Sequence, residues 1–102
     1  MPLTAGTILV APPDAHPIVG DGHVVLGRGP KENGHRPAID PLFRSVARWY
    51  GRRAIGVVLS GALNAGTAGL RAIQRCRGTA IVQDPSEASF ASMPHSALIH
   101  MD

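Results

Sequence analysis

The chain has 102 residues, of which 44% are hydrophobic and 17% are charged, a balance that excludes a disordered segment and allows one globular domain at most. Ten Lys and Arg against seven Asp and Glu give a net charge of +3, which gives little support to nucleic-acid binding. The one cysteine excludes an internal disulfide, and no run approaches the roughly 20 apolar residues that span a bilayer. We therefore expect a cytoplasmic protein without membrane insertion.

The N-terminal third predicts β structure followed by a loop. Residues 7–11 are a short apolar run closed by two prolines, a pattern typical of a buried strand. Residues 19–26 predict a tight hairpin with Asp21 and Gly22 in its turn. Residues 27–37 are rich in glycine, proline and charge, which indicates a loop.

A helix is predicted next, with Asp40 as its N-cap and Pro41 as its first residue. Gly51 is expected to end it in a left-handed conformation. Apolar residues recur on one face, and arginines recur every four residues on the other. The arginine stripe is either a solvated helix face or a surface that binds phosphate or acidic groups. The apolar face consists of Leu42, Phe43, Val46, Ala47 and Tyr50, and the stripe of Arg44, Arg48 and Arg52.

The C-terminal half predicts a parallel strand pair joined by a helix. Residues 54–60 are apolar without alternation, as in a strand buried on both faces. A turn at 61–66 leads to a helix at 67–77, which buries Leu70, Ile73 and Cys76 and ends at Gly78. Residues 79–83 predict a second buried strand, and the strand–helix–strand order implies a parallel pair. A last short helix is predicted at 94–100, capped by Ser92.

The predicted fold class is therefore α/β, a partial doubly wound, mainly parallel, Rossmann-like three-layer αβα sheet with a small hairpin. Ligands of such sheets bind beyond the carboxyl ends of the strands, which here are residues 11–16, 60–67 and 83–89. The turn at 61–67 has the glycine spacing of a phosphate loop. Thr67 stands where that loop needs lysine, so the turn does not predict a nucleotide site.

The residues alone indicate no catalytic centre or cofactor. No G-x-S-x-G elbow occurs, and no spacing pairs any of the five histidines with a serine and an acid. One cysteine and the absence of an H-x-x-x-H pattern predict no metal site. The triplet His35-Arg36-Pro37 is the most suggestive local feature, because it lies in a loop.

Several stretches in this order and at these intervals resemble the chemotaxis-type protein-glutamate methylesterases (CheB-type), and the resemblance covers essentially the whole chain. The stretches are VAPPDAH at 10–16, NGHRPAIDPLFRS at 33–45, GVVLSG at 56–61, GTAGL at 66–70, QDP at 83–85 and MP at 93–94.

The resemblance implies a hydrolase of glutamate methyl esters on the cytoplasmic helices of chemoreceptors, often also a glutamine deamidase, with a Ser-His-Asp site and no cofactor. The family's serine and histidine fall upstream of the region matched, so we expect this chain to lack both, together with a receiver domain. The family's aspartate pattern, L-[ST]-G-x-x-[DN]-D-G, covers Leu59 to Gly66 and places Ala65 at the aspartate. An active-site turn then contains Gly61, Asn64, Ala65 and Gly66, and a substrate-side loop contains His35, Arg36 and Asp40.

Three hypotheses follow for residues 1–102 as the C-terminal portion of a methylesterase-type catalytic domain. The first is a degenerate half-domain without hydrolase activity of its own. The second is half of a split enzyme that an N-terminal half-domain on another chain completes. The third is a non-catalytic module that binds chemoreceptor helices or another protein.

Overall fold

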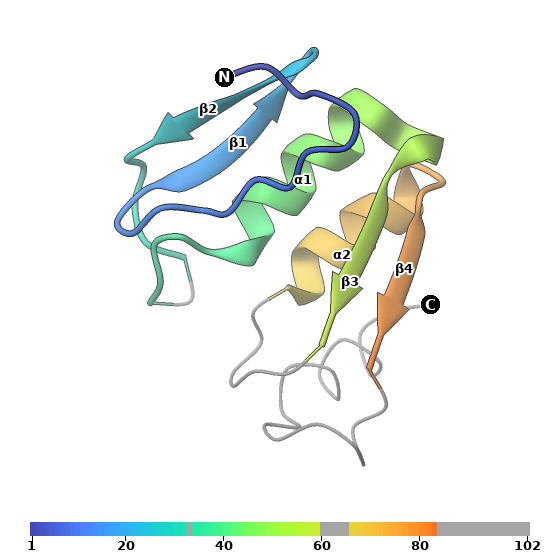
Figure 1. Ribbon diagram of the computed structural model, residues 1–102. Coiled ribbons are helices and arrows are strands. Elements are labelled where there is room, and N and C mark those ends of the chain that lie inside the picture. Colours follow the sequence, from blue (N-terminus) through green and yellow to red (C-terminus); the bar gives the residue numbers. More distant parts are fainter. Residues whose placement is uncertain (33, 60–65, 84–102) are drawn as a thin grey trace.

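The computed structural model describes residues 1–32, 34–59 and 66–83. Figure 1 shows two small sheets separated by two helices. Along the chain, the elements are β1 (His16–Gly20), β2 (His23–Gly27), α1 (Ile39–Tyr50), a 3-10 turn η1 (Gly51–Arg53), β3 (Ile55–Val58), α2 (Thr67–Arg75) and β4 (Thr79–Val82).

The two sheets lie on opposite sides of the helices. β1 and β2 form an antiparallel hairpin that packs on α1, and β3 and β4 form a parallel pair that packs on α2 (Figure 1). The helices pack against each other between them. The predicted α/β class, with its parallel pair and small hairpin, is confirmed. Within the described ranges, both helices cover the same face of β3 and β4.

The hairpin forms as predicted, around the two-residue turn in which Gly22 has φ 74°. Its outer edge at β1 offers few free donors. Pro17 has no N–H, and the N–H of Val19 donates to Ser45 Oγ of α1 at 2.9 Å. This bond fixes the hairpin on the helix. At the β2 edge, the N–H of Val24 donates to the carbonyl of Met1 at 2.7 Å.

Helix α1 begins differently from the prediction. Ala38, not Asp40, is the N-cap residue, and no side chain caps the helix. Asp40 lies inside the first turn, and its Oδ1 accepts a hydrogen bond from the backbone N–H of Gly69 at 2.8 Å. The carboxylate therefore links α1 to α2 instead of capping the N-terminus of α1. The predicted end at Gly51 is confirmed, with φ 48°.

The core lies between the helices and β3. Val58 and Leu70 are its centre on one side, and Ala47, Ala54 and Ile73 on the other. The helices approach closely at Gly69, where an added Cβ would stand 2.5 Å from the Cβ of Phe43. Only a glycine fits at that contact, and it places the start of α2 on the first turn of α1.

Three predicted strands differ in the structure. The strand predicted as buried at 79–83 forms as β4, but its Thr79 and Ile81 are exposed. The strand predicted at 7–11 is wrong, because this segment has no strand and leaves Ile8 and Val10 90% and 86% exposed. The burial of both faces predicted for residues 54–60 is also wrong. β3 alternates, with Gly56 and Val58 buried and Ile55 and Val57 exposed, because described helices cover one face alone.

Helix α2 ends two residues earlier than predicted, at Arg75. Arg77, not Gly78, takes the left-handed conformation, with φ 68°. The N–H of Gly78 donates to the carbonyl of Ile73 at 2.8 Å, which closes the helix end. Cys76, predicted to be buried, is exposed because the helix has already ended there. The helix predicted at 94–100 lies outside the described residues.

Candidate functional site

The predicted active-site turn enters the described structure at Gly66. The other three residues of that turn, Gly61, Asn64 and Ala65, lie outside it. Gly66 has φ 91° and directly precedes α2. A Cβ there would lie 3.1 Å from Val58 and 3.5 Å from Ile39, so the glycine allows both a left-handed backbone and close packing. The turn therefore ends against the core, at the junction of β3, α1 and α2.

Asp40 braces this junction. Its side chain is buried, with 5% of the residue exposed, and it holds the N–H of Gly69 in the first turn of α2. That N–H has no partner within its own helix turn, so the carboxylate satisfies a donor that burial would otherwise leave unpaired. Asp40 thus positions the helix that follows the predicted active-site turn.

Arg36 lies away from this junction and contacts the loop that precedes β1. Its Nε and Nη2 donate to Oδ1 of Asp14 at 2.9 and 2.6 Å, and its Nη1 donates to the carbonyl of Gly29 at 3.2 Å. The hydrogen bond and positive charge of Arg36 hold the pKa of Asp14 below its usual range. Arg36 therefore ties two loops together at the end of the hairpin.

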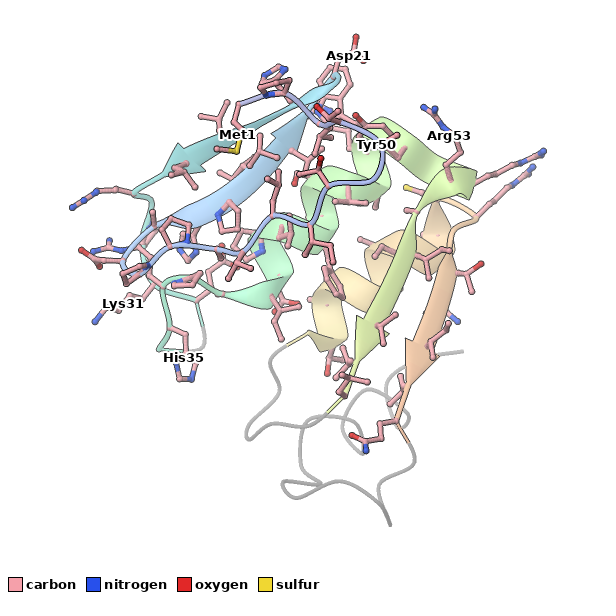
Figure 2. The ribbon with its side chains drawn as sticks, in the orientation of Figure 1. Met1, Asp21, Lys31, His35, Tyr50 and Arg53 are labelled. Atoms are coloured by element: carbon pink, nitrogen blue, oxygen red, sulfur yellow. The ribbon has the colours of Figure 1, made fainter. Side chains whose placement is uncertain are left out.

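His35 is exposed, and its side chain points away from the rest of the molecule (Figure 2). Its backbone pairs with that of Glu32 through two hydrogen bonds of 3.0 and 3.1 Å. The three residues of the predicted substrate-side loop therefore have separate settings. Asp40 lies at the helix junction, Arg36 lies between loops, and His35 faces solvent.

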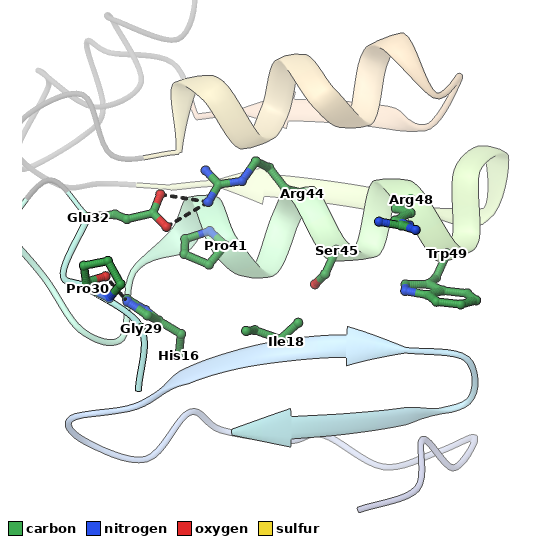
Figure 3. Close-up of a pocket in the computed structure, with 10 residues that line it drawn as sticks. All are labelled: His16, Ile18, Gly29, Pro30, Glu32, Pro41, Arg44, Ser45, Arg48 and Trp49. Atoms are coloured by element: carbon green, nitrogen blue, oxygen red, sulfur yellow. Dashed lines mark hydrogen bonds and ion pairs between the residues drawn. The ribbon is translucent and has the colours of Figure 1, made fainter. Parts of the chain in front are cut away.

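A groove that the sequence did not predict lies between β1 and α1 (Figure 3). Its volume is about 370 Å³. At one end, Nη2 of Arg44 donates to both carboxylate oxygens of Glu32 at 2.9 and 2.8 Å. This bond lowers the pKa of Glu32 and raises that of Arg44. The spacing of the arginines along α1 indicated which side of the helix lines the groove. The position of Glu32 opposite Arg44 depends on the conformation of the loop before α1, which the spacing does not predict.

His16 closes the groove as a buried, structural histidine that is 2% exposed. Its Nδ1 lies 3.2 Å from the backbone N–H of Ala38, which can only donate, and its Nε2 lies 2.8 Å from the carbonyl of Pro30, which can only accept. In this arrangement Nδ1 accepts the hydrogen bond from Ala38 and Nε2 donates to Pro30. Both nitrogens are engaged, so His16 has no free atom for proton transfer in this conformation.

The side chains described above hold segments of the chain together, and among the described residues they form no catalytic pair. His16 bonds to backbone atoms as above, His23 bonds to the carbonyl of Asp21, and the side chain of His35 faces solvent (Figure 2). No group of three His, Cys, Asp or Glu in this part of the chain is placed to hold a metal ion. No helix in it is both long and apolar enough to cross a membrane.

Comparison with known proteins shows one family. The family described as CheB methylesterase matches residues 1–101. Protein-glutamate methylesterase/protein-glutamine glutaminase 2 of Anaeromyxobacter dehalogenans (strain 2CP-C) is 39% identical over 97 residues, which are 95% of this chain and 28% of that protein. A putative enzyme of the same description from Leptospira interrogans is also 39% identical over 97 residues, 94% of this chain and 50% of that protein.

The fold has a solved counterpart as well. The crystal structure of the Thermotoga maritima CheB methylesterase catalytic domain matches with a TM-score of 0.82 and 31% identity, over 90% of this chain and 52% of that chain. The chain thus spans between 28% and 50% of the length of the curated relatives named above, and about half of the solved domain. Since the family match extends over nearly the whole sequence and the fold is shared, this chain belongs to the CheB methylesterase family.

Proposed function

We propose that the chain is the scaffold portion of a chemotaxis protein-glutamate methylesterase domain, acting in the cytoplasm toward chemoreceptors, and that it does not hydrolyse the methyl ester. The observation that carries the proposal is Ala65, one residue before Gly66, at the position where the resemblance places the family's aspartate. The turn and helix around that position keep the features that would support a site. Gly66 is left-handed, and Asp40 holds the helix that follows.

The loss of the carboxylate has a direct chemical consequence. In a Ser-His-Asp site, the aspartate holds the histidine in the correct tautomer and stabilises the imidazolium formed when the serine gives up its proton. The methyl group of alanine accepts no hydrogen bond and carries no charge. Disabling this acid in serine proteases lowers the rate by roughly 10⁴. The same loss is expected for ester or amide hydrolysis here.

The test is methanol release from a methylated chemoreceptor cytoplasmic domain. The chain would be assayed alone and after co-expression with the portion of the Thermotoga maritima catalytic domain that this chain does not match, which we expect to be N-terminal. Both assays would be repeated with Ala65→Asp. We expect background release from the chain in both settings, and release at least about 100-fold higher from the co-expressed Ala65→Asp variant, since restoring the acid is worth orders of magnitude.

Two outcomes would contradict the proposal. Release well above background by the unmodified chain, alone or complemented, would show that Ala65 does not disable the site. A complemented Ala65→Asp variant that forms the complex on size-exclusion chromatography but stays at background would show that position 65 is not the aspartate position.

A second function, assembly with a complementary segment, is favoured by the bare face of the parallel sheet. This face carries large aliphatic side chains that are 45% to 64% exposed, namely Ile55, Val57, Leu59 and Ile81. Parallel sheets in proteins are covered on both faces, because the connections that make them parallel place helices there. A face of this kind is typical of an interface that buries apolar area on assembly.

The expected partner is a segment equivalent to the part of the solved domain that this chain does not match. Fluorescence titration with that segment should give saturable binding, which Val57→Lys should weaken at least about tenfold by placing a charge in an apolar contact. Val25→Lys is the matched control, because Val25 is similarly exposed, at 53%, on the other sheet. Equal effects of the two substitutions would rule out the sheet face as the interface.

A further inference from the structure

The groove between β1 and α1 has one charged end that is neutralised and one that is not. Arg44 and Arg48 lie one helical turn apart on α1, and both line the groove (Figure 3). Arg44 is paired with Glu32, whereas Arg48 has no ion-pair partner in the part of the chain that the structure describes. Its guanidinium carbon lies 5.9 Å from the centre of the Trp49 ring. Arg48 is therefore the available cation of the groove.

Apolar surface adjoins this cation. Trp49 and Ile18 line the groove and are 48% and 39% exposed. Val25, which is 53% exposed, pairs with Ile18 across the hairpin and extends the apolar surface beyond the groove. The cation thus has an indole beside it and the aliphatic side chain of Ile18 across the groove, with Val25 beyond.

The polar groups of the floor have partners within the protein. Ser45 Oγ donates to the carbonyl of Leu42 at 2.7 Å and accepts from the N–H of Val19. Both nitrogens of His16 are engaged, as described above. A ligand therefore gains most from a charge contact with Arg48 and from apolar contact, and little from hydrogen bonds to the floor.

We propose that this groove binds an acidic peptide segment of a partner protein, with a carboxylate on Arg48 and a neighbouring apolar side chain against Ile18 and Trp49. Charge complementarity selects this class of ligand, since a guanidinium pairs well with a carboxylate. A nucleic acid gains little here, because affinity for a line of phosphates grows with the number of cations that contact it, and Arg44 is already paired with Glu32. The inference rests on the fold and does not depend on the proposed function.

The chain supplies its own reporter for a test, because Trp49 is its one tryptophan. The probe is a 12-residue peptide of alternating Glu and Leu, and the readout is Trp49 fluorescence during titration. The comparison peptide has Gln in place of every Glu. We expect saturable binding of the Glu peptide and at least about tenfold weaker binding of the Gln peptide, a factor that corresponds to the loss of one ion pair.

The variant that tests the site is Arg48→Glu, and its matched control is Arg52→Glu. Arg52 is exposed, lies in η1 directly after α1, does not line the groove, and undergoes the same change of charge. We expect Arg48→Glu to weaken binding of the Glu peptide at least about tenfold, whereas Arg52→Glu should change it less than about threefold. Thermal melts of both variants would establish that they are folded.

Three results would overturn the inference. Equal weakening by the two substitutions would show attraction to net charge instead of to the groove. Equal binding of the Glu and Gln peptides would remove the carboxylate from recognition. Displacement of the peptide by inorganic phosphate or by a single-stranded oligonucleotide at similar concentration would show a general anion surface in place of a peptide groove.

Discussion

Asp40 shows how far residue identity alone can predict a role. A carboxylate followed by proline is a common helix start, so the sequence favoured a cap. In the structure, the same carboxylate accepts the N–H of Gly69, 29 positions later in the chain. The chemistry was predicted correctly, since Asp40 does satisfy a donor at a helix start. The prediction named the wrong helix, because the donor belongs to α2 and not to α1. A contact between distant segments cannot be read from local spacing.

Gly69 offers a direct test of this junction. A Gly→Ala substitution inside a helix normally stabilises it by about 1 kcal/mol. Here the new methyl group would lie 2.5 Å from the Cβ of Phe43 and 3.0 Å from Oδ1 of Asp40, so we expect Gly69→Ala to lower the free energy of unfolding by about 1–3 kcal/mol. Urea denaturation followed by circular dichroism measures this change.

Gly29→Ala is the control for that experiment. An added Cβ at Gly29 meets nothing within 4 Å, so its effect should stay within about 0.5 kcal/mol. If Gly69→Ala were neutral or stabilising, the helices would not be held as closely as the structure indicates.

Two ion pairs hold the loops around the hairpin, one between two loops and one between a loop and α1. Arg36 holds Asp14, and Arg44 of α1 holds Glu32. Both arginines lower the pKa of the carboxyl group that they contact, below the ordinary values of 3.8 for Asp14 and 4.5 for Glu32. A group whose pKa is lower in the folded state stabilises the fold above its unfolded pKa and loses that contribution as the pH falls through its folded pKa.

The contribution of these two ion pairs to the melting temperature is expected to be steady from about pH 7 to about pH 5 and to fall as the pH decreases further. Glu32→Gln should melt lower than the unmodified chain at pH 7, and the difference should shrink as the pH falls through the lowered pKa of Glu32, below which the carboxyl is protonated in both states. Asp21→Asn removes an exposed carboxylate that has no ion pair in the described part of the chain, and should show no such pH-dependent difference. A constant difference for Glu32→Gln at every pH would contradict the ion pair.

The elements themselves were largely predictable where periodicity and turn residues agree. The hairpin, α1, α2 and the parallel pair all appear, since Gly22 and Gly51 stand at the positions of positive φ that their turns require. The strand predicted at 7–11 failed for a different reason. Its apolar run has the right composition, but burial depends on what packs against it, and described residues leave it uncovered.

The candidate site was less predictable than the fold. The position of Ala65 follows from a motif and stays a prediction, and Gly66, where that turn enters the described structure, has a left-handed backbone. The groove, by contrast, combines β1, the loop at Glu32 and one side of α1. The arginine spacing suggested that side of the helix as an anion surface but could not show which arginine is already paired. Only the tertiary structure distinguishes Arg44 from Arg48.

The parallel sheet has one face that the described helices cover and one face that they leave exposed. Adjacent valines of β3 illustrate the difference, because Val57 is 45% exposed and Val58 is 2% exposed. We expect Val58→Thr to lower the free energy of unfolding by about 1–3 kcal/mol, since it buries a hydroxyl group in the core. Val57→Thr should change it by less than about 0.5 kcal/mol.

The same pair of variants tests self-association. Sedimentation velocity should show that Val57→Thr reduces the concentration-dependent association of the chain, because the apolar area available for assembly becomes smaller. Val58→Thr, compared under conditions where it remains folded, should leave association unchanged. A chain that is monomeric at all concentrations, or equal stability losses for the two variants, would argue against a bare sheet face.

The blocked edge of β1 has a consequence for misassembly. A strand edge templates aggregation when its N–H and C=O groups are free to pair with another chain. In β1, Pro17 has no N–H and the N–H of Val19 is held by Ser45, so this edge of the hairpin is poorly suited to strand addition even though Ile18 and Val25 are exposed. Aggregates of this protein should therefore grow from β3 and β4, and protection of those two strands from hydrogen exchange on aggregation would mark where they begin.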